Sequence, residues 1–202
     1  MKFDGLNNEQ TTSSTRAQLL DLAVSLLQGL YFEAMNMLFA APKSALQDDE
    51  GLVQKKAYKV LVGILKEHKD FLANNLAEIF EHMVTRMSSY HFSAKRHRLD
   101  CMQYLIIHIL MTSEENKKGE IAYFLSEIIL AVKESNKKTR YWAYDLLVKI
   151  GHCLEDTENG GSQKMLHKFF NIVLGCLAGS TPHMISAAAT GITRLMYEFS
   201  EL

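Results

Sequence analysis

The sequence predicts an all-α fold, a right-handed α-solenoid of antiparallel helix pairs of the HEAT or armadillo type, with about four to five repeats. Apolar residues recur at three- and four-residue spacing along nearly the whole chain. The 202 residues include only two prolines, and both are expected outside the long periodic segments. A short motif also returns at a nearly constant interval, which is typical of solenoids whose repeat unit has about 40 residues.

Nine helices follow from the apolar periodicity, separated by short polar breaks. Their expected ranges are 15–28, 31–40, 52–67, 71–88, 94–112, 119–134, 138–154, 162–178 and 182–200. Ser93, Ser162 and Thr181 are the expected N-cap residues, because their hydroxyls can accept from backbone N–H groups of the first turn. Pro182, which follows Thr181, suits the first position of a helix.

The expected domain organisation is a tail followed by one repeat domain. Residues 1–14 are polar and aperiodic, so we expect a flexible N-terminal tail there and a single helical-repeat domain over 15–202. The last segment, ISAAATGITRLMYEF, is rich in small and apolar residues. We therefore expect the array to continue beyond Leu202.

The repeated motif reads Arg/Gln-x-x-small-x-x-x-aliphatic on the first helix of each pair. Its copies are Gln54, Ala57 and Leu61; Arg98, Cys101 and Leu105; Arg140, Ala143 and Leu147; Ile185, Ala188 and Ile192, which lacks the polar residue; and a weak copy at Arg16, Leu19 and Ala23. The small residues of the first four copies follow one another at intervals of 44, 42 and 45 positions. A small residue lets neighbouring helices approach closely, so this spacing favours a stacked array over an ordinary helical bundle.

Basic residues gather at the start of these first helices. They are Lys55, Lys56 and Lys59; Lys95, Arg96 and Arg98; and Lys137, Lys138 and Arg140. Because equivalent positions of a solenoid stack side by side, we expect a basic edge, although the net charge is −1. Cations near helix N-termini face the positive end of the macrodipole, which points to an anionic partner. The alternative stays open that this is a solvated face, with Arg98 and Arg140 engaged within the fold.

Acidic residues mark the opposite turns, within each helix pair. Glu114 and Glu115 occupy one such turn, and Glu155, Asp156 and Glu158 occupy the next. The molecule is therefore expected to be polarised from edge to edge.

The motifs of common catalytic and metal sites are absent from the sequence. There is no Gly-rich phosphate loop, HExxH, GxSxG or metal-type Cys/His cluster. His97 and Cys101 are four residues apart, but two ligands do not make a metal site. His108 and His152 have apolar neighbours, as core histidines do, and Trp142 either packs between repeats or offers a stacking platform. We expect no enzyme activity and no cofactor.

The cysteine and hydropathy patterns indicate an intracellular protein. Cys101, Cys153 and Cys176 have apolar contexts and no CxxC spacing, which predicts reduced, buried thiols. No leader opens the chain, and the longest apolar run, YLIIHILM at 104–111, is far shorter than the roughly 18 residues that a membrane span needs. We expect no membrane association.

Five segments carry a resemblance to a known family. They are GLVQKKAYKVL (51–61), HFSAKRHRLDC (91–101), EIILAVKESNKKTR (127–140), AYDLLVKIG (143–151) and TPHMISAAATGITRLMYEFS (181–200). They resemble the central helical-repeat region of the ribosomal RNA-processing protein 12 family, and the likeness runs from about residue 15 to the end. Family members are far longer, so we expect this chain to be a fragment or a short plant-type paralogue.

The resemblance implies a nuclear and nucleolar HEAT-repeat factor that shuttles to the cytoplasm. It implies binding to pre-ribosomal RNA or pre-ribosomal particles, contact with ribosome assembly factors, and help with subunit export through Ran and karyopherins. It carries over, as RNA- or partner-binding residues, the basic motif positions Lys55, Lys56, Lys95, Arg96, Arg98, Lys137, Lys138 and Arg140. We expect a monomer. The competing hypothesis is a general protein-binding armadillo or HEAT module, similar to a transport factor, that makes no RNA contact.

Overall fold

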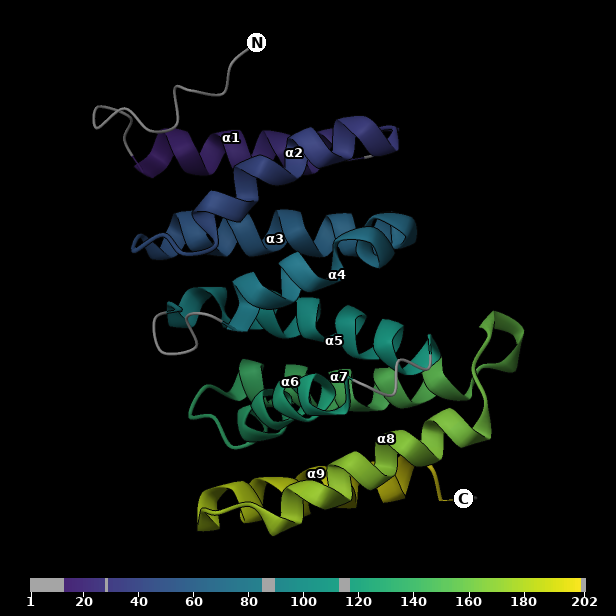
Figure 1. The fold of residues 1–202 in the computed structure, drawn as a ribbon. Helices are drawn as coiled ribbons and strands as arrows, with labels where there is room; N and C mark the ends of the chain where they lie inside the picture. Colours follow the sequence, from purple (N-terminus) through teal and green to yellow (C-terminus); the bar gives the residue numbers. More distant parts are fainter. Residues whose placement is uncertain (1–12, 28, 85–89, 113–116, 201–202) are drawn as a thin grey trace. The chain divides into compact units, whose positions relative to one another are not determined.

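The computed structural model describes residues 13–27, 29–84, 90–112 and 117–200, and every regular element in these ranges is a helix (Figure 1). The α-helices are α1 Ser13–Leu26, α2 Phe32–Ala45, α3 Gly51–Glu67, α4 Lys69–Val84, α5 Lys95–Met111, α6 Lys118–Ala131, α7 Lys137–Glu155, α8 Gln163–Gly175 and α9 Pro182–Glu198. Each corresponds to one expected helix, with ends shifted by a few residues. None of these helices combines the length and the hydropathy that crossing a bilayer requires.

The chain divides into two compact units, Met1–Cys101 and Met102–Leu202. The division falls inside α5. The single repeat domain expected over 15–202 stays a prediction. The expected flexible tail lies outside the described residues, except that Ser13 and Ser14 already belong to α1.

The N-terminal unit shows the packing order of a repeat array. First helices pack on first helices, because α1 contacts α3, and second helices pack on second helices, because α2 contacts α4 (Figure 1). The α2–α4 contact includes the rings of Phe39 and Phe71, whose centroids are 5.3 Å apart in an edge-to-face arrangement. An added Cβ on Gly63 of α3 would collide with Leu27, so this glycine permits the close approach of the chain's first segment to α3.

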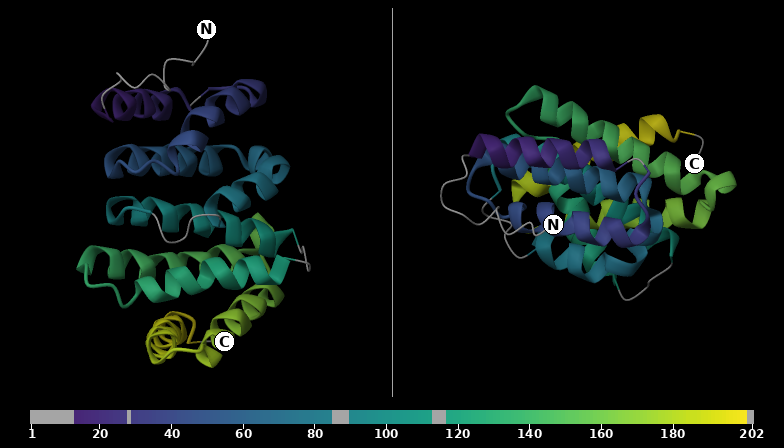
Figure 2. Two further views of the ribbon diagram at one scale, coloured as in Figure 1. Left: turned by 60° about the vertical axis from the view of Figure 1, so that its left-hand side comes forward. Right: turned by 90° about the horizontal axis from the view of Figure 1, so that it is seen from above.

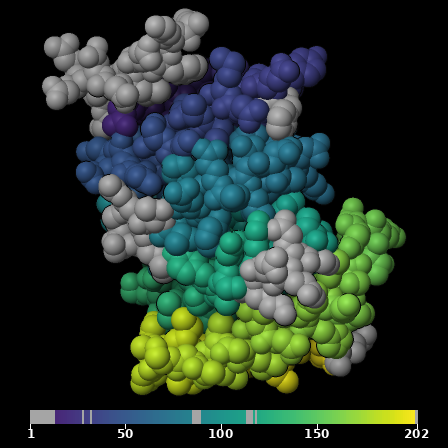
Figure 3. Space-filling model, viewed as in Figure 1, coloured from purple at the N-terminus to yellow at the C-terminus, as the bar shows by residue number. Residues whose placement is uncertain are grey.

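The C-terminal unit repeats this order. α7 packs on α9, α6 packs on α8, and α6 also contacts α7 and α9 (Figure 2). Gly151 of α7 lies under the ring of Phe199, which a Cβ at this position would meet at 2.5 Å. Phe199 also stands perpendicular to Phe170 of α8, with ring centroids 5.8 Å apart. In the space-filling view, α8 and the residues after it form a closely packed surface, green to yellow (Figure 3).

Helix starts agree with two of the three expected caps. The Ser162 hydroxyl accepts from the N–H of Met165 at 3.3 Å, and the Thr181 hydroxyl accepts from the N–H of Met184 at 3.2 Å. The Ser93 cap was wrong. A 3₁₀ turn, Phe92–Ala94, precedes α5, and its cap is the side chain of His91. The Ser93 hydroxyl instead donates to the carbonyl of Gly51, 3.0 Å away.

Two further expectations are corrected. Pro42 lies inside α2, within its last turn, where the missing N–H removes one hydrogen bond and the helix ends soon afterwards. The weak motif copy on α1 fails because Leu19 is 42% exposed, whereas Leu20 and Ala23 are buried.

Candidate nucleic-acid interface

The polar position of the repeated motif is a structural position. Arg98 is only 1% exposed. Its guanidinium donates to the Tyr58 hydroxyl and to the Met83 carbonyl, both at 2.8 Å. The guanidinium carbon also lies 4.9 Å from the centroid of the Tyr90 ring. Arg98 therefore cannot reach a partner on the surface, and the prediction that it binds RNA or a partner needs correction.

The other two copies use the same position in the same way. Gln54 is buried, donates to the Leu46 carbonyl at 3.2 Å, and accepts from the N–H of His91 at 2.6 Å. Arg140 is half-buried and donates to the carbonyls of Glu134 and Ser135 at 2.7 and 2.8 Å.

These acceptors share one place in the fold, the end of the preceding helix. Leu46 is the C-cap of α2, Met83 lies in the last turn of α4, and Glu134 and Ser135 follow the end of α6. Carbonyls at a helix C-terminus lack intrahelical donors, and the dipole there favours a cation. The motif's polar side chain therefore ties α3, α5 and α7 each to the helix before it.

The small and aliphatic motif positions form the core, as predicted. Ala57, Cys101, Ala143 and Ala188 are all fully buried. The Cys101 thiol lies 3.8 Å from the Tyr58 carbonyl, which shows how closely α5 approaches α3. Burial raises the pKa of the Cys101 thiol well above its ordinary value, so this thiol is the neutral, buried group that the sequence indicates.

The lysines at the start of α3 differ in what they contact. Lys56 is held by both carboxylate oxygens of Asp21, at 2.6 and 2.8 Å. Lys59 is exposed and lies 3.8 Å from the same carboxylate. Lys55 is half-buried and makes no ion pair or hydrogen bond within the described residues. Lys56 is therefore neutralised inside the unit, whereas Lys55 and Lys59 present charge outward.

The start of α5 lies beside the start of α3. The Ser93–Gly51 and His91–Gln54 hydrogen bonds join the turn before α5 to the first turns of α3. Arg96 is exposed, and Lys95 is half-buried with its ammonium 5.9 Å from the centroid of the Tyr90 ring. The turn before α5 therefore lies beside the start of α3, and a common basic edge of Lys55, Lys95 and Arg96 stays a prediction.

Two exposed cations lie at the start of α7, in the C-terminal unit. Lys137 and Lys138 are both exposed, and the Lys137 ammonium lies 5.7 Å from the centroid of the Tyr141 ring. Tyr141 is 58% exposed and Trp142 is 41% exposed, so aromatic surface accompanies these charges.

The acidic turn after α7 serves local structure in part. Asp156 accepts from the backbone N–H groups of Glu158 and Asn159 and from the Asn159 amide. The hydrogen bond from the Asn159 side chain is the main cause that lowers the pKa of Asp156. Glu114 and Glu115 lie outside the described residues.

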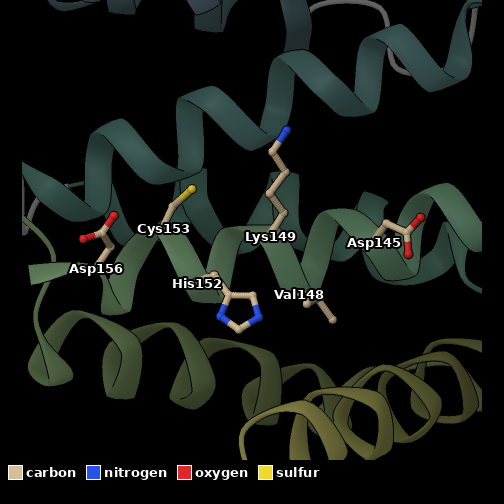
Figure 4. Close-up of a pocket in the computed structure, with 6 residues that line it drawn as sticks. All are labelled: Asp145, Val148, Lys149, His152, Cys153 and Asp156. Atoms are coloured by element: carbon tan, nitrogen blue, oxygen red, sulfur yellow. The ribbon is translucent and has the colours of Figure 1, made fainter. Parts of the chain in front are cut away.

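Two hollows border α7 in the C-terminal unit. The first, about 370 Å³ in volume, is lined by α7 and its C-cap residue, through Asp145, Val148, Lys149, His152, Cys153 and Asp156. Lys149 and Cys153 project to one side of the helix and Val148 and His152 to the other, so these groups do not converge on a common point (Figure 4). Within the described residues, no group of three or more acidic, histidine or cysteine side chains is placed to hold a metal ion.

The second hollow is a cleft between α7 and α9 that sequence reasoning missed. It has a volume of about 550 Å³ and is lined by Tyr144, Ala189, Thr190, Thr193, Arg194 and Tyr197. The available signal was the polar and aromatic stripe on α9, whose members recur three or four positions apart. Only the packing of α9 on α7 adds Tyr144 to it.

The fold defines a class, the helical-repeat proteins of the armadillo and HEAT type. An engineered protein of known crystal structure aligns with 96% of this chain and 79% of its own, at a TM-score of 0.58 and 12% identity. A designed armadillo-repeat protein in complex with the peptide (KR)4 aligns with 92% of this chain and 77% of its own, at a TM-score of 0.50 and 10% identity. At such identities the likeness establishes the fold alone. The prediction of an all-α solenoid of helix pairs is confirmed.

The chain is similar in sequence to several curated proteins. Ribosomal RNA-processing protein 12 of Saccharomyces cerevisiae is 27% identical over 210 residues, which cover 96% of this chain and 17% of that protein. The RRP12-like proteins of Gallus gallus and Homo sapiens are each 28% identical and cover 97% and 93% of this chain. No protein-family model matches the chain. The resemblance to the ribosomal RNA-processing protein 12 family is confirmed, and the chain spans about one sixth of the length of these relatives.

Proposed function

We propose that this chain is a non-enzymatic helical-repeat scaffold that acts in ribosome biogenesis by contacting ribosomal RNA precursors. The observation that carries the proposal is the similarity to relatives named for ribosomal RNA processing, which extends over 93–97% of the chain. The similarity includes the helices that bear the basic turns, so the proposed function is assigned to the repeat array itself.

The distribution of cations supports an anionic partner. The fold uses Arg98, Arg140 and Lys56 for internal contacts. The proposed binding residues are then Lys55, Lys95 and Arg96 in the N-terminal unit and Lys137 and Lys138 in the C-terminal unit. All five side chains are at least partly exposed, and the four in the first turns of α5 and α7 face the positive end of the macrodipole, which disfavours them by a few tenths of a kcal/mol each. An RNA backbone would offset that repulsion and release counterions on binding.

The same proposal extends to the cellular location of the chain and to its protein partners. In this account the chain docks on pre-ribosomal particles in the nucleolus and nucleus, beside ribosome assembly factors, and the protein assists subunit export with Ran and karyopherins. Exposed helix faces suit such protein contacts, because repeat arrays present extended surfaces.

Reversing three charges at the starts of α5 and α7 is expected to weaken RNA binding strongly. With five phosphate contacts, the log–log salt slope for single-stranded RNA is about −3.5. The triple variant Lys95→Glu, Arg96→Glu and Lys138→Glu leaves two of these contacts, so it should bring that slope to about −1.4 and weaken binding more than tenfold at low salt. Fluorescence anisotropy of a labelled single-stranded RNA at several salt concentrations measures both quantities.

The matched control reverses three exposed lysines outside the basic turns, Lys66, Lys69 and Lys164. Net charge changes equally in the two triple variants, so a general electrostatic effect would weaken both alike. Equal loss in the two, or unchanged binding in the first, contradicts the proposed interface. A parent chain that binds no RNA would favour the protein-binding module.

A further inference from the structure

We infer that the cleft between α7 and α9 is a subsite for an unstacked base of single-stranded RNA, with the base against the tyrosine rings and a phosphate at Arg194. This inference rests on the proposed function and deepens it, because it names the form of RNA and the residues that read it. All residues of the cleft belong to the C-terminal unit, and none of them belongs to the basic turns.

The aromatic side chains of the cleft come from both helices. Tyr197 of α9 is 76% exposed, so its ring contributes little to the core. Tyr144 of α7 is half-buried and lines the same hollow. Two tyrosines at one opening offer π-faces to a flat ligand, and each base stacked on an aromatic side chain contributes substantially to binding whatever its sequence.

The charge of the cleft favours a phosphate over a basic peptide. Arg194 is 43% exposed at its side chain, and its guanidinium carbon lies 5.9 Å from the centroid of the Tyr197 ring. Its contact with Glu198 is long, at 4.0 Å, and Glu198 also contacts His152 at 3.2 Å. The guanidinium is therefore available beside the aromatic surface, the arrangement that binds the backbone next to a stacked base.

The hydroxyls of the cleft act as acceptors. Thr190 donates to the Ser186 carbonyl at 2.8 Å, and Thr193 donates to the Ala189 carbonyl at 2.9 Å. Each hydroxyl proton is thus used within α9, while the oxygen lone pairs stay available. Acceptors of this kind suit the exocyclic amino groups of bases and the ribose 2′-OH, which distinguishes RNA from DNA.

The residue that α7 contributes to the cleft, Tyr144, shares a helix face with residues at the start of α7. Lys137, Tyr141 and Tyr144 are spaced by four and three residues, so they lie along one face of the helix. The Lys137 ammonium already lies over the Tyr141 ring. An RNA strand with one base at Tyr144 and Tyr197 would therefore find a second tyrosine, Tyr141, beside a lysine farther along α7.

Replacing the exposed ring is expected to weaken binding of single strands without changing the salt slope. For Tyr197→Ala, the Kd of the full chain for a labelled oligouridylate should rise about 5- to 100-fold, the range that stacking losses predict. Tyr197→Phe should retain affinity, because the π-face remains. Arg194→Gln should instead flatten the log–log salt slope by about 0.7, since it removes one phosphate contact.

The matched control is Tyr31→Ala, which removes a tyrosine that is 85% exposed and lies in the other unit. A blunt RNA duplex, whose bases are stacked, should not distinguish Tyr197→Ala from the parent. If Tyr197→Ala and Tyr31→Ala bind the single strand equally, the subsite is wrong while the proposed function stands. If the parent binds no RNA, both fail. Tyr197-dependent binding of a polyglutamate peptide in place of RNA would overturn the inference in favour of an acidic protein.

Discussion

Replacing Arg98 by alanine is expected to lower the free energy of unfolding by about 3–5 kcal/mol. Arg98 is among the largest fully buried side chains, so its removal opens a cavity in the core. The Tyr58 hydroxyl and the Met83 carbonyl would each lose a charged donor at 2.8 Å. Urea unfolding followed by far-UV circular dichroism measures the loss.

The matched control for this experiment is Arg140→Ala, at the same motif position. Arg140 is only half-buried, and water can replace its hydrogen bonds to two carbonyls, so about 1 kcal/mol is expected. Arg98→Lys should fall between the two, because it keeps the charge but not the fork of donors. Small and equal losses at both arginines would contradict the structural role of the buried position.

Substituting Gly151 by valine is expected to destabilise the chain by about 2–3 kcal/mol. The new Cβ would meet the Phe199 ring at 2.5 Å, and that ring cannot swing away freely because it packs against His152 and Phe170. The α7–α9 contact would have to open to accommodate the added methyl groups. Thermal unfolding of the purified variant measures the effect.

Two further variants test whether the clash with Phe199 causes this loss of stability. Gly175→Ala should be neutral or slightly stabilising, because a Cβ there meets nothing within 4 Å. Adding Phe199→Leu to Gly151→Val should restore part of the stability, since it relieves the clash that causes the loss. Additive effects of Gly151→Val and Phe199→Leu would show that the two positions are not in contact as described.

Periodicity was sufficient to predict the helices, because burial of one helical face fixes the spacing of apolar residues. The motif's small and aliphatic positions were predictable for the same reason, and Ala57 and Leu61 are completely buried. Pro42 shows where prediction of helix ends from sequence fails. Sequence rules place a proline outside a helix, but Pro42 lies inside α2, near its end, where a proline is tolerated.

The roles of the cations were not predictable from the motif. Arg98 and Arg96 are two residues apart, yet one is buried and the other exposed. The burial of Arg98 depends on Tyr58 and Met83, which the fold brings to it from 40 and 15 positions away. The α7–α9 cleft was missed for a similar reason, because Tyr144 and Tyr197 become neighbours only through helix packing.

The structure separates two uses of positive charge. Two guanidiniums at the motif position bind carbonyls at the end of the preceding helix and stabilise the array. The lysines near them and Arg96 are at least partly exposed. Of these lysines, Lys56 is neutralised by its ion pair with Asp21. Ligand binding is therefore expected to respond to changes at the exposed set, whereas folding responds to changes at Arg98.

We propose that this chain contacts precursors of ribosomal RNA in the cell. This contact can be measured by ultraviolet crosslinking of the protein that carries the chain, purification under denaturing conditions, and sequencing of the attached RNA. We expect ribosomal precursors to be enriched over a tag-only control, and most of this enrichment to be lost in the Lys95→Glu, Arg96→Glu and Lys138→Glu variant. Recovery of precursors at the tag-only level from the unaltered protein would contradict the claim.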